Sequence, residues 1–338
     1  MIRASDLLVP RPEGLYCPPG DFHIDPVRPV RRALITHGHS DHARPGHGAV
    51  LATPETLDIM ELRMGPDFAR ERQAAPYGAP LDVGGVSVSF HPAGHVLGSA
   101  QIAVGWRGLR ITAAGDYKRT PDPTCAAFEP VPSDIFITEA TFGLPVFRHP
   151  APEAEARRLI DSLALFPDRA HLVGAYSLGK AQRLIRLLRD VGYDAPIRIH
   201  GALTRMCDYY VSRGIDLGEL TPATVAGQKG RGFGGEIILG PPSAFAATWV
   251  RRFADPLIAF ASGWMRVRAR ARQRGVELAL VISDHCDWPE LTETLTELSP
   301  AETWVTHGRE EALVRWCALN GFAARPLHLV GYEDEAED

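Results

Sequence analysis

The segment His37-Gly38-His39-Ser40-Asp41-His42 constrains this 338-residue chain more than any other. Three imidazoles and a carboxylate fall within six residues, directly after the apolar run 33–36. Neutral imidazoles and carboxylates are the ligands that zinc and similar divalent ions take in proteins. His and Asp are also common in surface turns, but a surface turn gives no reason for this alternating spacing behind a buried strand. The segment therefore predicts a metal site on a loop at the end of a strand, rigidly held yet open to substrate.

The composition is that of an ordinary globular protein, with 45% hydrophobic and 23% charged residues over a length that suits two folded units. No apolar run is long enough to span a bilayer, and the first residues lack the pattern of a secretory leader. The five cysteines are scattered without a CxxC pair, which favours reduced thiols. We therefore expect a cytoplasmic protein with no membrane partner. The net charge of −5 does not exclude nucleic acid, because a local basic patch can bind phosphates on an acidic surface.

Further titratable side chains stand at the ends of predicted strands. The strands are expected at 83–90, 109–114, 134–138, 279–283 and 303–306, and the side chains that follow them are His95, Asp116, Glu139, His285 and His307. Asp116 follows Gly115, and a carboxylate in such a place can bridge two metal ions with its two oxygens. Asp25 closes a short strand before the hexapeptide and has two interpretations of equal weight. It either accepts a hydrogen bond from a ligand imidazole or starts a turn before Pro26.

The middle of the chain changes character and predicts a second, smaller α/β domain with a parallel sheet. A helix is expected at 151–165 and a strand at 171–176. The turn Ser177-Leu178-Gly179-Lys180 then leads into a basic amphipathic helix. Because amide groups and the helix dipole point at such a turn, Ser177 and Lys180 are candidates for binding a substrate phosphate, although the spacing is not that of a Walker A loop.

Three other segments of this region and of the C-terminus carry weaker signals. The glycine-rich stretch 227–235 predicts a mobile loop, and the acidic tail 331–338 predicts disorder. The arginines of 266–274 occupy every second position. They form either a solvated basic helix or edge strand, which is the favoured interpretation, or a cationic wall for a nucleic-acid backbone.

The hexapeptide H-x-H-x-D-H resembles the signature of the metallo-β-lactamase superfamily. Together with Glu139, the inserted α/β region, S-D-H at His285 and T-H-G at His307, the chain resembles the β-CASP nucleases over nearly its whole length. The segments L-Y-C-P-P-G-D-F, S-G-W-M and D-H-C-D-W are most similar to the bacterial ligase-associated DNA exonucleases, an SNM1-like family. The resemblance implies an α/β fold, an αββα metallo-β-lactamase sandwich with an inserted β-CASP domain. The expected bounds are 1–144 and 281–330 for the core, 145–280 for the insert and 331–338 for the tail.

The same resemblance implies a role for each site residue. One metal ion would be bound by His37, His39 and His95, and a second by Asp41, His42 and His307. Asp116 would bridge the two ions, and Asp25 would hold a ligand imidazole. His285 would act as the general acid, with Glu139 hydrogen-bonded to it. The implied cofactors are two divalent ions, Zn²⁺ in the first place and Mn²⁺ as the alternative.

The implied activity is hydrolysis of DNA phosphodiesters by a single-strand exonuclease in repair, associated with an ATP-dependent DNA ligase and a helicase. A β-CASP ribonuclease is the main alternative, because SNM1-type enzymes have a small aliphatic residue where His307 stands, whereas the RNA-processing branch has a histidine. A scaffold protein without catalysis is the more distant alternative. It is disfavoured because degenerate relatives lose metal ligands, whereas all seven ligand positions are occupied by suitable residues in this chain. A β-lactamase or thioesterase-like hydrolase would leave residues 144–280 without a role.

Overall fold

The computed structural model describes residues 3–224, 233–245, 248–273 and 275–329. Most of the predicted loop 227–235, and the whole of the tail 331–338, lie outside these residues. The chain divides into two compact units, the first formed by Met1–Phe147 with His285–Glu337 and the second by Arg148–Asp284. That the second unit is an inserted domain with the bounds 145–280 stays a prediction.

The first sheet of unit 1 contains six strands in chain order, from β1 to β6. Their bounds are β1 Val9–Arg11, β2 Gly14–Cys17, β3 Phe22–Ile24, β4 Arg32–Leu34, β5 His47–Ala52 and β6 Ala69–Ala74. A short helix, α1 (Ala4–Leu7), precedes them, and α2 (Pro54–Met64) connects β5 to β6. Helix α2 has the predicted bounds because the Thr53 side chain accepts a hydrogen bond from the Thr56 amide and Pro54 occupies the first turn.

The second sheet of unit 1 has seven strands in the order β19-β18-β11-β10-β9-β8-β7. The strands are β7 Leu81–Val83, β8 Val86–Pro92, β9 Ala100–Trp106, β10 Leu109–Ala113, β11 Ile135–Ala140, β18 Glu302–Gly308 and β19 Ala324–Pro326. The helices α8 (Trp288–Leu298) and α9 (Glu310–Leu319) belong to the same half of the unit. Strands far apart in the sequence meet here, since β11 pairs in parallel with β18.

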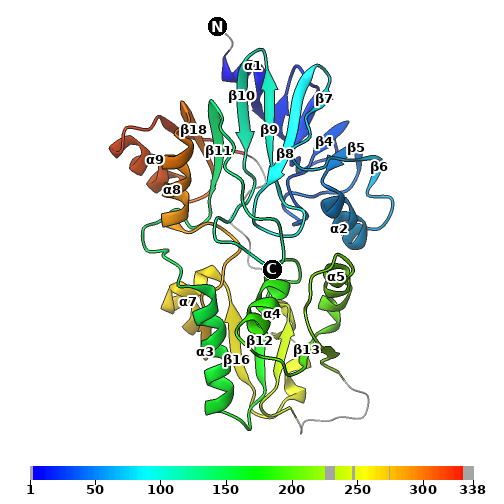
Figure 1. Cartoon of the computed structure of the whole chain (residues 1–338), viewed down its shortest axis with the longest axis vertical. Coiled ribbons are helices and arrows are strands. Elements are labelled where there is room, and N and C mark those ends of the chain that lie inside the picture. Colours follow the sequence, from blue (N-terminus) through cyan, green and yellow to red (C-terminus); the bar gives the residue numbers. More distant parts are fainter. Residues whose placement is uncertain (1–2, 225–232, 246–247, 274, 330–338) are drawn as a thin grey trace. The chain divides into compact units, whose positions relative to one another are not determined.

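Alternating burial along the strands produces the four layers of unit 1 (Figure 1). Leu34 and Leu51 of the first sheet join Ile102, Ile111 and other side chains of the second sheet in one cluster between the sheets. Their neighbours along the first sheet, which include Ala33 and Val50, pack in a cluster with Met60 of α2. On the far side of the second sheet, Phe136 packs with residues of α8 and α9. The predicted αββα sandwich is therefore confirmed.

Unit 2 contains a third sheet of six strands, in the order β14-β13-β15-β12-β16-β17, whose pairings are all parallel. The strands are β12 His171–Gly174, β13 Ile197–Ile199, β14 Leu220–Pro222, β15 Ile237–Gly240, β16 Leu257–Ala261 and β17 Leu278–Leu280. The helical segments are α3 Pro152–Leu165, α4 Lys180–Asp190, α5 Gly201–Ser212, α6 Pro242–Phe245, η1 Thr248–Arg252, η2 Gly263–Arg266 and α7 Arg268–Gln273. The predicted α/β unit with a parallel sheet is present.

Two strand ends of unit 1 need glycine for close packing. Gly115, at a φ of +59°, has the Thr36 side chain where a Cβ would lie, with the Thr36 Cβ 2.8 Å away. At Gly308, with a φ of +104°, a Cβ would lie 2.8 Å from the Thr141 Cα and would collide with the carbonyl group of Ala140. Asp116 follows the first glycine and His307 precedes the second, so the backbone packs tightly beside both side chains.

His307 itself lies inside β18, because this strand continues to Gly308. The predicted loop position after a strand at 303–306 is therefore wrong. The backbone at His307 has a φ of +59°, in the left-handed region. This conformation is uncommon for a residue with a side chain and is maintained by the tight surroundings of Gly308.

Among the described residues, no helix has both the length and the apolar character needed to cross a membrane. The five cysteines are free thiols, and all except Cys125 are buried.

We predict that Gly308→Ala destabilises the protein more than Gly321→Ala does. Gly321 also has a positive φ, of +80°, but has open space where a Cβ would lie. Gly321→Ala should cost about 1–2 kcal/mol, the penalty for a left-handed backbone, whereas Gly308→Ala adds an overpacking cost of about 1–3 kcal/mol. Urea denaturation of both variants measures the difference. Equal losses would show that Gly308 is not tightly packed.

Candidate metal centre

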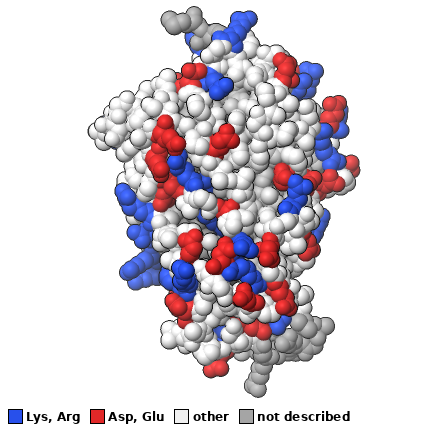
Figure 2. Space-filling view, in the orientation of Figure 1, with Lys and Arg blue, Asp and Glu red and all other residues white. Residues whose placement is uncertain are grey.

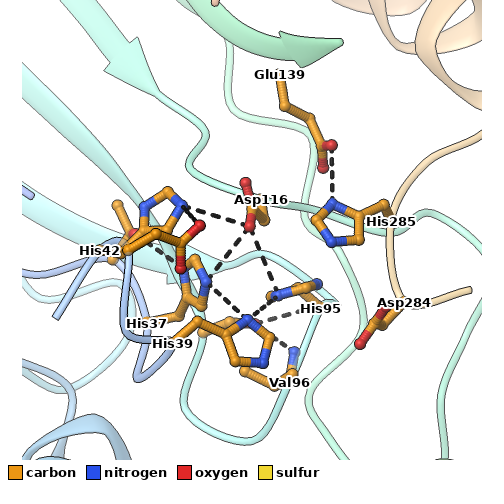
Figure 3. Close-up of polar contacts among 12 residues, drawn as sticks. His37, His39, His42, His95, Val96, Asp116, Glu139, Asp284 and His285 are labelled. Atoms are coloured by element: carbon orange, nitrogen blue, oxygen red, sulfur yellow. Dashed lines mark hydrogen bonds and ion pairs between the residues drawn. The ribbon is translucent and has the colours of Figure 1, made fainter. Parts of the chain in front are cut away.

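Seven potential ligand side chains of unit 1 converge at one edge of the two sheets (Figure 3). Four of them, His37, His39, Asp41 and His42, stand on the loop that follows β4. The others are His95 after β8, Asp116 after β10 and His307 in β18. Their ligand atoms fall into two groups, each with all members within 4.8 Å of one another: His37, His39, His95 and Asp116, and Asp41, His42 and His307.

In the first group, the ligand atoms lie close to one another. His39 Nδ1 lies 3.1 Å from His37 Nε2 and 3.0 Å from His95 Nε2. Asp116 Oδ2 lies 3.4 Å from His37 Nε2 and 3.8 Å from His95 Nε2. Metal–ligand bonds of about 2.0–2.1 Å in tetrahedral geometry place ligand atoms about 3.3 Å apart. The spacing therefore fits a zinc-sized cation.

The second group meets the first at Asp116. His42 Nε2 lies 3.4 Å from Asp116 Oδ2 and 3.6 Å from Asp41 Oδ2. The His307 ring stacks on that of His42, with the centroids 5.9 Å apart. Asp116 is thus within reach of ligands from both groups, which is the position required of a bridging carboxylate.

A buried carboxylate oxygen offers an independent test of whether a cation fits. Asp116 is 2% exposed, and its Oδ1 has no hydrogen-bond partner among the described residues. An ionised oxygen without a donor is costly inside a protein unless a cation compensates its charge. The donor set, the spacing and this oxygen all fit divalent metal ions.

Asp25 is connected by hydrogen bonds to one imidazole of each group. Its Oδ2 accepts hydrogen bonds from His42 Nδ1, at 2.8 Å, and from Thr36 Oγ1, at 2.5 Å, while its Oδ1 accepts one from the Thr36 amide. Because the Thr36 hydroxyl gives its proton to Asp25, it is left to accept the His37 Nδ1 proton at 3.0 Å. When these two imidazoles are neutral, each carries its proton on Nδ1 and presents Nε2 to the cluster as a lone-pair donor. The geometry agrees with the first interpretation of Asp25, whose role stays a prediction.

Glu139 links Asp116 to the candidate general acid (Figure 3). Its Oε2 accepts a hydrogen bond from His285 Nδ1 at 2.9 Å, and its Oε1 accepts one from the Tyr117 amide at 2.8 Å. The His285 ring lies 4.7 Å from that of His95, measured between centroids. One buried carboxylate therefore positions His285 and the backbone next to Asp116.

A second buried carboxylate, Glu290 in α8, joins the same two loops. It accepts a hydrogen bond from Lys118 Nζ and, at 2.7 Å, one from the Thr120 amide. It also accepts the Asp287 amide within a capping box at the start of α8. The loop that carries Asp116 is thereby connected to the loop that carries His285.

The charged side chains of the centre shift one another's pKa values. Burial, and then the neighbouring His42, hold the pKa of His37 well below its usual value. Burial acts on His42 in the same direction, but the Asp116 and Asp41 carboxylates outweigh it and hold the pKa of His42 well above its usual value. Burial raises the pKa of Asp116, but His42 and His285 outweigh it, so this pKa is well below the usual value.

The remaining sequence-predicted residues, Ser177 and Lys180, lie in unit 2. Lys180 is buried, and its Nζ lies 3.0 Å from Asp284 Oδ1 and 4.7 Å from the centroid of the Tyr176 ring. Their role in binding a phosphate stays a prediction, and the pairing with Asp284 means that Lys180 does not present an isolated charge.

Three further residues that position the site become apparent only in the structure. In the sequence, Thr36 is an ordinary residue of the strand before the hexapeptide, whereas the capping-box pattern D-W-P-E at 287–290 is a signal that points to Glu290. Ser99 accepts hydrogen bonds from the amides of His95 and Val96 and so fixes the turn that carries the His95 ligand.

The chain is similar to several known proteins, although no protein-family model matches it. A "Probable DNA ligase" from Opitutus terrae is 27% identical over 90% of this chain and 30% of its own length. "Endoribonuclease YSH1" from Eremothecium gossypii is 34% identical over 35% of this chain and 16% of its own length. "Endoribonuclease YSH1" from Gibberella zeae is 32% identical over 50% of this chain and 20% of its own length. The chain thus spans under a third of the length of these relatives.

Among solved structures, a protein of unknown function from Enterococcus faecalis V583 superposes with a TM-score of 0.58 at 14% identity, over 88% of this chain and 79% of the other. This likeness concerns the fold alone. The αββα layers and the ligand cluster on the loops of one edge define a protein of the metallo-β-lactamase type. With its parallel α/β second unit and its similarity to the YSH1 proteins, the chain resembles the β-CASP group of that superfamily.

We predict that Thr36→Val weakens metal binding about 10–100-fold, the usual effect of removing a partner that orients a ligand. Valine keeps the shape of threonine but can neither donate to Asp25 nor accept from His37. Thr36→Ser is the matched control, because it keeps the hydroxyl and should bind metal as the wild type does. Competition with a chromogenic zinc chelator measures the affinities. Wild-type affinity in Thr36→Val would contradict the orienting role.

Proposed function

We propose that this chain is a metal-dependent phosphodiesterase that hydrolyses DNA, acting as an exonuclease on single strands or ends. The observation that carries the proposal is the position of Asp116, within 3.4 Å of His37 Nε2 in one ligand group and of His42 Nε2 in the other. A carboxylate shared in this way, with a buried His–Glu pair beside it, suits in-line displacement at a phosphate. Two divalent cations, Zn²⁺ or alternatively Mn²⁺, would supply a hydroxide at neutral pH and offset the charge of the phosphoryl oxygens.

The chain's own residues have distinct tasks in this proposal. The seven ligands hold the cations. Asp25 keeps His42 directly, and His37 through Thr36, in the metal-binding tautomer. His285 gives the proton of its Nε2 to the leaving oxygen, because its Nδ1 is occupied by Glu139. Glu139 fixes the ring and opposes the positive charge of the protonated imidazole.

DNA is the proposed substrate because the similarity that extends over 90% of this chain is to a protein named as a probable DNA ligase. That similarity also supports association with a DNA ligase, whereas the ATP dependence of the ligase and a role in repair rest on the family resemblance. A helicase partner and a cytoplasmic location rest on the family resemblance alone. RNA is the alternative substrate, since the YSH1 relatives are named endoribonucleases and share a shorter part of the chain.

We predict that the wild type with Zn²⁺ or Mn²⁺ shortens end-labelled single-stranded DNA faster than RNA of matched sequence. His39→Ala and Asp116→Ala should abolish cleavage, while circular dichroism shows the fold retained. His39 is partly exposed, so its truncation leaves no large cavity. Faster cleavage of RNA would favour the ribonuclease alternative. Full activity in either variant would contradict the proposed site, and no activity of the wild type on any polynucleotide would favour a scaffold.

We also predict that His285→Ala lowers kcat about 10²–10⁴-fold, the usual contribution of a general acid, without lowering the metal content. His91→Ala is the control, since His91 of β8 pairs with Glu129 outside the ligand groups and should not affect kcat. Metal analysis beside single-turnover kinetics separates the two effects. Loss of metal in His285→Ala would instead make His285 a ligand.

A further inference from the structure

Four arginines project from one short segment of unit 2. The segment comprises η2 (Gly263–Arg266) and α7 (Arg268–Gln273), and its arginines are Arg266, Arg268, Arg270 and Arg272. The buried side chains of Met265 and Ala271 anchor it in a cluster with Phe260 and Val281. The Ser262 side chain accepts a hydrogen bond from the Trp264 amide and so fixes the start of η2. The segment is therefore an ordered part of the unit with its basic side presented to solvent.

Three arginines of this segment have no acidic partner among the described residues. Arg266, Arg268 and Arg272 are exposed, and the ion pairs found for the described residues include none of them. Arg270 stacks on Trp264, with its guanidinium carbon 4.0 Å from the ring centroid. No acidic residue occurs in the sequence between Asp255 and Glu277.

Four other arginines of the same unit are paired with acidic residues. Arg158 pairs with Glu155, Arg169 with Glu277, Arg186 with Asp190 and Arg198 with Glu236. The contrast is greater because the whole chain carries a net charge of −5. In Figure 2, basic side chains gather at the edge of unit 2 where Figure 1 shows α7.

Such an arrangement costs stability in the absence of a ligand. Arg268 and Arg272 are four residues apart in α7, and like charges at this spacing destabilise a helix. Three exposed, unpaired guanidinium groups within seven residues attract a polyanion and release its counterions when they bind it. Each planar guanidinium can also donate two parallel hydrogen bonds to the oxygens of one phosphate.

We propose that Arg266, Arg268 and Arg272 form a binding surface for the phosphate backbone of a single-stranded nucleic acid. The proposal rests on the proposed function for the identity of the polyanion, but not on cleavage. Contacts to the backbone are independent of base sequence, so this surface contributes affinity and not sequence specificity.

The test is binding of a fluorescein-labelled oligothymidylate by anisotropy, at several salt concentrations, in an Asp116→Asn background that prevents cleavage. The variant R266Q/R268Q/R272Q should weaken binding at least tenfold at 0.1 M salt. The slope of log K against log[salt] should fall by about 2, because each lost single-strand contact removes about 0.7. The control R107Q/R157Q/R205Q removes the same charge from three scattered exposed arginines and should change the slope by less than half as much.

Hydrolysis of bis(p-nitrophenyl) phosphate, measured with Asp116 intact, distinguishes this proposal from the proposed function. The small ester needs the metal centre but no backbone contact, so the triple variant should hydrolyse it at the wild-type rate. If the triple variant binds the oligonucleotide as the parent does, or loses no more affinity than the control, the binding surface is overturned and the nuclease proposal stays intact. If the triple variant loses binding as expected but neither the wild type nor the arginine variants hydrolyse the ester, the nuclease proposal is overturned and the binding surface is supported.

Discussion

The structure depends on the close approach of buried imidazole nitrogens and carboxylate oxygens around Asp116. His39 Nδ1 lies within hydrogen-bonding distance of both His37 Nε2 and His95 Nε2. A neutral imidazole carries only one proton, so these three nitrogens cannot all be joined by hydrogen bonds. Lone pairs that face each other at this distance repel unless a proton or a cation lies among them. The seven ligands therefore have a spacing that the rest of unit 1 must hold against repulsion when no metal is bound.

Unit 1 resists this repulsion through shared carboxylates at the ends of packed strands. Asp25 connects His42 with Thr36 and, through it, His37, so it controls one ligand of each group. Glu139 connects His285 with the backbone beside Asp116, and Glu290 connects the same loops a second time. The backbone contributes as well, because Asp25 and His307 both have positive φ angles. Local strain of this kind is found where the surrounding structure determines a functional geometry.

Much of the site could be predicted from the sequence because its ligands follow strand ends, where the hydrophobic pattern is clear. The hexapeptide after 33–36 and the carboxylate after Gly115 are examples. Thr36 could not be predicted, because a threonine at the end of a buried strand is ordinary until its hydroxyl is placed between Asp25 and His37. Strand β18 extends beyond the predicted range 303–306. Glycine usually ends a strand, but Gly308 packs closely against Ala140 and the strand continues to it. The interactions of Lys180 depend on Asp284, more than a hundred residues away, which periodicity cannot detect.

The central claim is that two cations bind between loops that lie far apart in the sequence, with Asp116 between them. Anomalous diffraction at the zinc absorption edge, on crystals of the zinc-loaded protein, tests it most directly. We expect two peaks, one within about 2.3 Å of His37 Nε2, His39 Nδ1 and His95 Nε2, and one within about 2.3 Å of His42 Nε2, with Asp116 contacting both. A single peak, or zinc bound away from these side chains, would contradict the account.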